Sequence, residues 1–485
     1  MIKQALANNM ESRSQQRDGL TKVTAILTEA EHAWGAGQWQ RSQALAMPLF
    51  ECQLSVPECL RVARFCLQTG NFERAQTQFE RALTQGPVHP RFLRDLSALH
   101  WRQGNRATAR HLSRRAAMLE PLARAPRTAN ARCAALRINA AENCHHMLRW
   151  NEDLGIYVRR LGGGHFATRH LVRHGEIDFD VAHACNDNLA KCVLSPDTKV
   201  IVNTIACPDL HAHALTTTAR FLERHPQATV INSPTQVQQT TRDNNYQRMR
   251  GLDGVIYPPT TRVRINSNNA EVYAAALEIG YPLLARIAGT QTGESLARIG
   301  SHEKLRDYLA ALPSGSELYL ARYFDCRAAD GLYRKTRAFF IAGQFYPVAR
   351  LSNTDWQIHS GDRYRVMSQS PQHQIEEQDY LCDPEKFLGA DAISALRAIA
   401  EAIDLDFFGI DFWVRPDGQV IVFEANAVMR HNFDHATTFP YTRPHLERIS
   451  DAFVAMVAGP ATSNSKANPK SPQNLKNSRN LPIKP

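Results

Sequence analysis

The sequence predicts an α+β multidomain protein in which an all-α region precedes two regions that mix helices and strands. Glycines recur every 33 to 34 residues near the N-terminus, short β-branched runs alternate with helical stretches from residue 154, and hairpin signals appear after residue 246. We therefore predict five segments. They are an N-terminal segment (1–23), helical hairpins (24–140), a small α/β domain (150–245), a larger mixed domain (246–458) and a disordered basic tail (459–485).

The composition is that of a globular protein, since 485 residues with 43% hydrophobic content can bury several cores. No apolar run approaches the ~20 residues that a membrane-spanning helix needs, so we expect no membrane partner. The N-terminus lacks an apolar signal core and carries Glu11 and Asp18, which predicts a cytoplasmic protein. The ten cysteines include no Cys-x-x-Cys pair, which argues against structural zinc and a disulfide framework.

The helical hairpins are marked by Gly37, Gly70 and Gly104, each followed two residues later by a large side chain. The segment LQTGNFERAQTQFERALTQGP, at 67–87, places small, aromatic and helix-breaking residues at regular positions, and the next unit repeats them less closely. These units resemble tetratricopeptide repeats, and a generic helical bundle is the alternative. Stacked repeats form a concave groove, so the resemblance implies a recognition surface.

The formal charge of +10 is concentrated rather than spread. Residues 58–137 hold 15 arginines, no lysine and five acidic residues, and the segment 459–485 holds four lysines and Arg479 without an acid. Charge of this density favours an acidic partner, such as an acidic peptide or protein, by long-range attraction. A solvated arginine-rich face is the alternative, and nucleic acid ranks last because no stacking motif accompanies the charge.

The small α/β domain is predicted from four strand-like runs, GIYVRRL, FDVAHAC, KVIVNTI and ATVINSP, with a helix around 214–224. Three glycines at 162–164 follow the first run, but the segment lacks the GxGxxG pattern. We therefore expect an ordinary glycine turn there rather than a dinucleotide site.

A hairpin in the larger domain carries the candidate metal ligands. The segment FGIDFWVRPDGQVIVFEANAVMRHN, at 408–432, contains two apolar runs around an Asp-Gly pair, which is a strong hairpin signal. If Asp417 and Gly418 are the two loop residues, Asp411 lies opposite Glu424, and Asn426 lies on the same face. Phe412 and Phe423 then share the opposite, core-facing side. Two facing carboxylates repel each other without a cation, and these oxygen donors suit magnesium.

An Asp followed thirteen residues later by Glu-x-Asn on a late hairpin resembles the metal site of the ATP-grasp superfamily, which includes D-alanine–D-alanine ligase. The resemblance covers residues 160–445. It implies ATP and two Mg²⁺ ions, for which Mn²⁺ can substitute, with Glu424 bridging the ions, Asp411 holding one and Asn426 the other. An ordinary hairpin with surface carboxylates is the alternative.

The segment GYPLLARIAGTQTGESLARI resembles the superfamily's phosphate-covering loop between two strands. The resemblance implies that nucleotide phosphates contact Arg286, which replaces the usual lysine, and the backbone of the loop residues Gly289, Thr290, Gln291, Thr292 and Gly293. A second lysine is expected after the small domain, where Asn244 or Asn245 stands with Arg248 nearby.

The remaining expected site residues lie on the strands and loops that follow. The run ELYLARYF, at 317–324, corresponds to a hinge that offers backbone groups to adenine, and Tyr323 is its candidate. Lys335 and Arg337, two apart on one strand face, are candidates for contact with phosphate or acylphosphate, and an ordinary exposed strand face is the alternative. Five further residues are expected near the acceptor pocket, namely Arg350, Trp356, His359, His431 and Asn432, and Arg430 is the candidate catalytic residue of the last loop.

The resemblance implies an ADP-forming carboxylate–amine ligase, which activates a carboxylate as an acylphosphate for attack by an amine or another nucleophile. The helical repeats would then recruit a peptide or protein substrate, which is inference by architecture. The alternative is a non-catalytic scaffold that senses nucleotide, favoured by the missing lysines and opposed by the metal triad.

Overall fold

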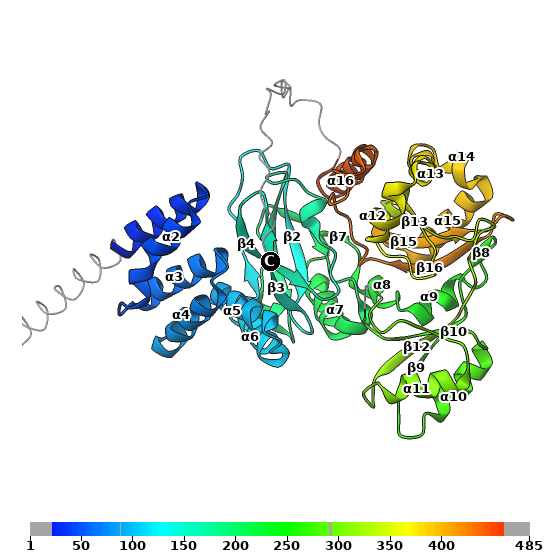
Figure 1. The fold of residues 1–485 in the computed structure, drawn as a ribbon, viewed down its shortest axis with the longest axis horizontal. Helices are drawn as coiled ribbons and strands as arrows, with labels where there is room; N and C mark the ends of the chain where they lie inside the picture. The colour runs from blue at the N-terminus through cyan, green and yellow to red at the C-terminus, as the bar shows by residue number, and fades with distance from the viewer. Residues whose placement is uncertain (1–21, 88, 291–292, 460–485) are drawn as a thin grey trace, which may run out of the picture.

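The computed structural model describes residues 22–87, 89–290 and 293–459. Within these residues the apolar side chains form three large clusters, one for the N-terminal helices, one shared by the two α/β regions and one for a smaller subdomain. Figure 1 shows the helices at one end, the first α/β domain in the middle and the C-terminal sheets at the other end. The predicted N-terminal segment, except its last two residues, and the predicted basic tail, except Gly459, lie outside the described residues.

The N-terminal region is all-α, as predicted, and its helices pair into antiparallel hairpins. Ser55 and Glu58 form a capping box at one helix start, and Gly37, Gly70 and Gly104 end three helices with φ of 74°, 84° and 86°, where a side chain would strain the backbone. Their likeness to tetratricopeptide repeats stays a prediction. The helices are 22–35, α2 (Trp39–Ala46), η1 (Met47–Phe50), α3 (Val56–Gln68), α4 (Phe72–Gln85), α5 (Pro90–Arg102) and α6 (Arg106–Leu119).

A two-stranded hairpin of β3 (His145–Asn151) and β4 (Ile156–Gly162) lies against these helices. Arg159 donates hydrogen bonds to Asp95 and to the carbonyl oxygen of Arg91, 2.9 Å away, so the hairpin follows α5. The Trp34 indole donates to Gly155 O at 2.7 Å, and Tyr157 packs edge-on against Phe72. The run GIYVRRL therefore covers the helices and is not the first strand of the α/β sheet.

The first α/β domain is a five-stranded sheet in the order β1-β5-β2-β6-β7, parallel except at β1. Its central strand, β2, lies within residues 24–140, which were predicted to be helical. That part of the prediction was wrong because CAALRINA is buried on both faces and so lacks the alternation that marks a half-exposed strand. The elements are β1 (Leu122–Ala123), β2 (Cys133–Ala140), η2 (Thr168–His170), β5 (Ile177–Ala184), η3 (Asn188–Lys191), β6 (Thr198–Asn203), α7 (Pro208–Glu223) and β7 (Thr229–Ile231).

A linker leads into a four-stranded antiparallel sheet in the order β11-β10-β12-β9, with two helices on it. The linker holds α8 (Pro234–Gln238), α9 (Arg242–Met249) and β8 (Val255–Ile256). The subdomain comprises β9 (Thr260–Arg264), α10 (Ala270–Ile279), β10 (Leu283–Ile287), β11 (Ala297–Ile299), α11 (His302–Ala310) and β12 (Glu317–Arg322).

A second five-stranded sheet, β14-β13-β15-β16-β8, is antiparallel except where β8 joins it. The hairpin around Ala342 and Gly343 forms as predicted, with both residues at positive φ. The elements are β13 (Tyr333–Ile341), β14 (Gln344–Asn353), α12 (Asp362–Val366), η4 (Met367–Gln369), α13 (Pro371–Cys382), α14 (Pro384–Leu388), α15 (Ala390–Ile403), β15 (Phe407–Val414), β16 (Val420–Asn426), η5 (Pro440–Thr442) and α16 (Arg443–Ala458).

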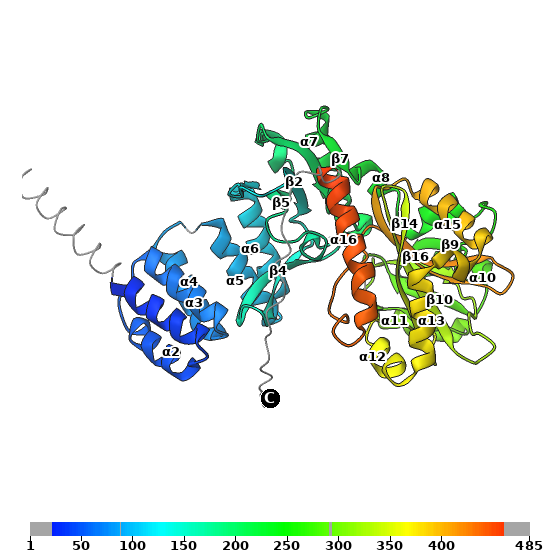
Figure 2. The same cartoon turned by 90° about the horizontal axis from the view of Figure 1, so that it is seen from above.

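The last helix, α16, joins this sheet to the first α/β domain. Its Phe453 ring lies 5.1 Å from that of Phe407 on β15 and 6.1 Å from that of Phe166 in the first domain. Figure 2 shows α16 running between the two regions, which explains why they share one apolar cluster. None of the described helices has the length and apolarity that crossing a membrane requires.

Candidate functional site

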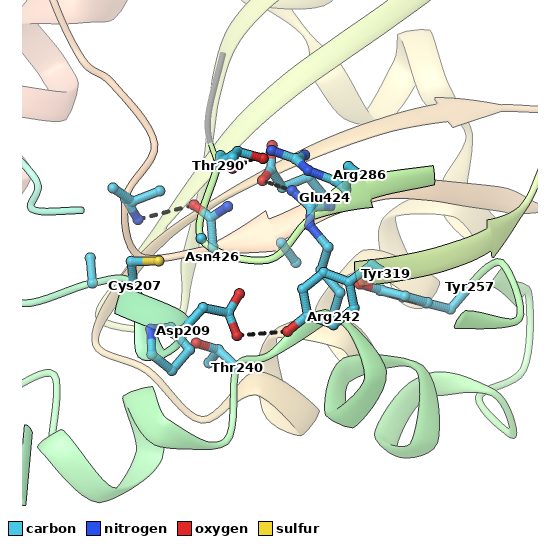
Figure 3. Close-up of a pocket in the computed structure, with 15 residues that line it drawn as sticks. Cys207, Asp209, Thr240, Arg242, Tyr257, Arg286, Thr290, Tyr319, Glu424 and Asn426 are labelled. Carbon is cyan, nitrogen blue, oxygen red and sulfur yellow. Dashed lines mark hydrogen bonds and ion pairs between the residues drawn. The ribbon is translucent and has the colours of Figure 1, made fainter. Parts of the chain in front are cut away.

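A cavity of about 1010 Å³ lies between the two antiparallel sheets and reaches the glycine turn of the first domain. The four-stranded sheet lines it with residues of β10 and β12, and the five-stranded sheet with residues of β13, β14, β15 and β16. A cavity of about 40 Å³ adjoins it, where α7, α9, β10 and β16 meet (Figure 3). Elements from three regions of the chain therefore meet at one site.

The hairpin pairing predicted for the metal ligands is confirmed, because Asp411 lies opposite Glu424 in the β15–β16 ladder. The predicted two-residue loop is wrong. Arg415 N donates to Gln419 O at 2.9 Å, so the loop is longer than two residues and the strands next to it pair in a shifted register. A bulge at Phe423 restores the predicted register farther from the loop. Phe423 is consequently 36% exposed, whereas its predicted core partner Phe412 is fully buried.

In addition to lying opposite Glu424, Asp411 forms ion pairs with cationic side chains of the neighbouring strand β13. Arg337 lies directly opposite it and donates two hydrogen bonds, from Nε to Oδ1 at 2.6 Å and from Nη2 to Oδ2 at 2.8 Å. Lys335 Nζ is 3.5 Å from Oδ2. Burial acts to raise the pKa of Asp411, but the two cations outweigh burial and hold that pKa below its usual value. Lys335 and Arg337 therefore share one face, as predicted.

Glu424 is paired with Arg242, the first residue of α9, which the sequence analysis did not select. Burial acts to lower the pKa of Arg242, but the charges of Glu424 and Asp209, together with the nearby Tyr257 and Tyr319, outweigh burial, so that pKa is raised. Asn245 and Arg248, which were predicted to lie near the phosphates, form hydrogen bonds with the backbone instead. Asn245 donates to Ala425 O at 3.0 Å, and Arg248 donates to carbonyl groups at the end of α15. Arg242 could have been found from the sequence, because it lies in the first turn of a helix just after the first domain.

Arg286, which was predicted to contact phosphate, lines the smaller cavity and donates to the carbonyl oxygen of Thr290 (Figure 3). Burial, with the nearby charge of Arg242, lowers its pKa to about 10, so it stays charged at neutral pH. Gly289 and Gly293 have φ of 80° and 78° and lie against Leu210 and His359. Gln291 and Thr292 lie outside the described residues.

The donor atoms around the hairpin fit a hard cation. Asp411, Glu424 and Asn426 all line the larger cavity and offer only oxygen, apart from the Asn426 amide nitrogen. Asn426 Oδ1 accepts from Val428 N at 3.0 Å, and an amide oxygen has two lone pairs. In the described part of the chain no three His, Cys, Asp or Glu side chains cluster as a metal site, and the predicted set contains only two such residues beside the amide of Asn426.

The hinge residues line the other end of the cavity. Tyr323 faces it, with the Arg298 guanidinium 4.1 Å from its ring and Trp356 edge-on at 6.0 Å. The amide of Tyr323 already donates to Pro282 O at 3.3 Å, and that of Arg322 to Pro259 O at 2.9 Å. The ring of Tyr323, rather than its N–H group, is therefore what this residue offers to a ligand.

Four of the residues predicted for the acceptor pocket line the cavity, namely Arg430, Asn432, Trp356 and His359, and Trp356 does so beside Tyr323. Arg430 is exposed and paired with Asp434 at 2.7 Å. Arg169 of η2, which was not predicted, lines the same cavity from the first domain.

Two residues predicted for the acceptor end do not belong to the site. Arg350 is turned toward α13, where it pairs with Glu376 at 2.8 Å. His431 is buried against α16, 3.2 Å from Ser450 Oγ, and burial lowers its pKa to about 3. His431 therefore stays neutral at physiological pH and does not face the cavity.

Asp209, in the first turn of α7, links the first domain to the four-stranded sheet. Its Oδ1 accepts from the Tyr319 hydroxyl at 2.7 Å (Figure 3). The same oxygen lies 3.2 Å from Arg262. Burial and the charge of Asp209 raise the pKa of Tyr319 above its usual value, so the hydroxyl stays a donor. This contact holds one wall of the smaller cavity.

No protein-family model matches the chain, and no curated protein matches it either. Among solved structures it is similar to a RimK-domain ATP-grasp protein from Sphaerobacter thermophilus, with 15% identity and a TM-score of 0.36 over 58% of this chain and 90% of that one. It is also similar to a D-alanine–D-alanine ligase from Bacillus anthracis, with 11% identity and a TM-score of 0.37 over 66% and 97% of the two chains. A third is an N5-carboxyaminoimidazole synthetase from Staphylococcus aureus complexed with ADP, with 12% identity and a TM-score of 0.39 over 70% and 81%.

Proposed function

We propose that this chain is an ATP-grasp ligase that activates a carboxylate with ATP and joins it to an amine or another nucleophile. The observation that carries the proposal is the pairing of Asp411 with Glu424 at the wall of the cavity between two antiparallel sheets. Cationic side chains from α9, β10 and β13 converge on the same wall, and they suit a polyphosphate.

The cationic side chains would have two roles, binding the nucleotide's phosphates and stabilising the transferred phosphoryl group. Arg242 and Arg286 line the smaller cavity and would hold the nucleotide's phosphates by charge-assisted hydrogen bonds. Lys335 and Arg337 lie on the strand beside Asp411 and would stabilise charge on the transferred phosphoryl group. Mg²⁺ bound by Asp411, Glu424 and Asn426 would neutralise phosphate charge.

The reaction would proceed in two displacements. A substrate carboxylate oxygen attacks the terminal phosphorus of ATP, and the bond to ADP breaks, which leaves an acylphosphate. The amine then attacks the acyl carbon, phosphate leaves, and the amine loses a proton. Arg430 and Arg169, which line the far end of the cavity, would orient the carboxylate substrate.

The test is phosphate release from Mg·ATP, measured against panels of carboxylates and amines. Arg242→Gln should lower the apparent affinity for ATP by at least about tenfold, as expected for loss of a charge-assisted bond of ~1.5–3 kcal/mol. Arg250→Gln is the matched control, because Arg250 ends the same helix and is exposed. Equal behaviour of the two variants would refute the phosphate role of Arg242.

A non-catalytic scaffold that senses nucleotide is the second candidate. It is favoured by one observation: both carboxylates are already paired with arginines, Asp411 with Arg337 and Glu424 with Arg242. Such a protein would bind Mg·ATP, with a rise in melting temperature, but would release no phosphate with any substrate pair. Phosphate release above the rate of an Asp411→Asn variant would exclude it.

A further inference from the structure

The predicted recognition groove is occupied by the protein itself, because the β3–β4 hairpin lies along α5 and reaches Trp34 of the first helix. Several arginines of the basic segment also have partners within the protein. Arg74, Arg102 and Arg106 lie over the rings of Phe50, Phe72 and Trp101, and Arg94, Arg124 and Arg127 pair with acidic residues. The arginines on the outer face of α6 differ from these, because they form no ion pair with a described acidic side chain.

That face carries a surface that we name the α6 patch, consisting of Arg110, Arg114, Arg115, Met118 and Leu119, all exposed. Residues four apart on a helix are neighbours. Arg110, Arg114 and Met118 therefore form one row on the helix surface, and Arg115 and Leu119 form a second row. The three arginines form no ion pair with any described acidic side chain, and α6 itself contains no Asp or Glu. Met118 and Leu119 are 50% and 58% exposed.

Like charges spaced four residues apart destabilise a helix, and no described acidic side chain on α6 relieves that repulsion. We propose that the α6 patch binds an acidic segment of a partner polypeptide, whose carboxylates pair with the three arginines while an apolar side chain covers Met118 and Leu119. Charge complementarity supports this occupant, since the patch is cationic at one end and apolar at the other.

The side chains around the patch favour a polypeptide over nucleic acid. Binding to single-stranded nucleic acid without sequence preference relies on free aromatic faces for base stacking. The ring beside the patch, Trp101, stacks on His145 at 3.6 Å on one side and lies under the Arg106 guanidinium, 3.8 Å away. Its faces are therefore covered, whereas Met118 and Leu119 remain available for apolar contact.

The experiment measures binding of fluorescent probes to the full chain by anisotropy at low ionic strength and again at about 0.15 M salt, where the Debye length is about 8 Å. The probes are a peptide of glutamate and leucine, a peptide of glutamate alone and an oligothymidylate of matched charge. We expect the glutamate–leucine peptide to bind most tightly and to weaken with salt. Tighter binding of the oligothymidylate would overturn the proposal.

The variant combines Arg110→Gln, Arg114→Gln and Arg115→Gln, which removes three exposed charges without touching the inner face of α6. The control combines Arg220→Gln, Arg306→Gln and Arg443→Gln, which removes the same charge from side chains 62%, 62% and 52% exposed. We expect about tenfold weaker peptide binding in the first and less than about twofold in the second, because only the first loses three ion pairs with the peptide. Equal losses in both variants would overturn the proposal.

A third variant tests the apolar end of the patch. Met118→Ser with Leu119→Ser should weaken binding of the glutamate–leucine peptide but leave the glutamate peptide unchanged. Unchanged binding of both peptides would show that the patch acts by charge alone and would overturn the assignment of an apolar contact. Circular dichroism of each variant confirms that α6 remains folded.

Discussion

Replacing Glu424 by Gln separates the structural role of this carboxylate from its proposed role in holding metal and nucleotide. The substitution keeps the side chain's size and removes its charge, so Arg242 loses its ionic partner. Sequence reasoning alone leads to the opposite expectation, that relief of repulsion between Glu424 and Asp411 leaves the apo protein as stable or slightly more stable. Because Arg337 and Lys335 already balance Asp411, that relief is small.

The loss of stability can be bracketed from the exposure of the pair. The Arg242 and Glu424 side chains are 22% and 33% exposed, which places the pair between an exposed ion pair and a buried one. Exposed pairs contribute about 0.2–1 kcal/mol, and breaking a buried pair costs about 3–5 kcal/mol. We therefore expect Glu424→Gln to lower the free energy of unfolding by about 1–2 kcal/mol, which lies between these limits.

Urea unfolding of the single and double variants at Glu424 and Arg242 measures the coupling energy directly. Glu317→Gln is the matched control, because Glu317 pairs with Arg262 at the exposed edge of the four-stranded sheet and should cost less than about 1 kcal/mol. In Glu424→Gln, Mg·ATP should no longer raise the melting temperature, and phosphate release should stop. Additive effects of the two single variants, or full turnover, would refute the reasoning.

Three further outcomes are expected. Arg286→Ala should weaken ATP binding by ~1.5–3 kcal/mol and Arg286→Lys should largely preserve it, measured by calorimetry; unchanged binding in the alanine variant would mean that Arg286 does not contact phosphate. Deleting residues 1–121 should leave a folded protein that binds Mg·ATP. Deleting residues 1–140 should prevent folding, because this deletion removes the central strand β2. The expectation would be contradicted if the longer deletion gave a soluble protein that unfolds cooperatively in urea. Burial lowers the pKa of His431 to about 3, so the unfolded chain binds a proton at this side chain below pH ~6.5 that the folded protein does not, and His431 should contribute up to ~1.4 kcal/mol per pH unit to the loss of stability as pH drops from there toward 3. Burial acts in the same direction on His170 and His435, so His431→Gln should reduce the slope in urea unfolding at several pH values without abolishing it, and an unchanged slope would assign the proton to other groups.

The features that depend on local periodicity could be predicted from the amino-acid sequence. The spacing of Gly37, Gly70 and Gly104 predicted helical hairpins, and these glycines lie where helices end, with the positive φ that glycine adopts without strain. Strand alternation placed Asp411 opposite Glu424 even though the loop was mispredicted, because the bulge at Phe423 compensates the shift at the tip. These predictions succeeded because side-chain direction follows directly from the backbone period.

The contacts between groups that are far apart in the sequence could not be predicted and depend on the tertiary structure. Glu424 is paired with Arg242, 182 positions away, and the resemblance pointed instead to Asn244 or Asn245. The β3–β4 hairpin covers the helices that were expected to recruit a partner, which leaves α6 as the exposed basic face. Periodicity tells which residues share a face of an element, but what that face contacts depends on how distant elements pack, and packing energy is summed over the whole core.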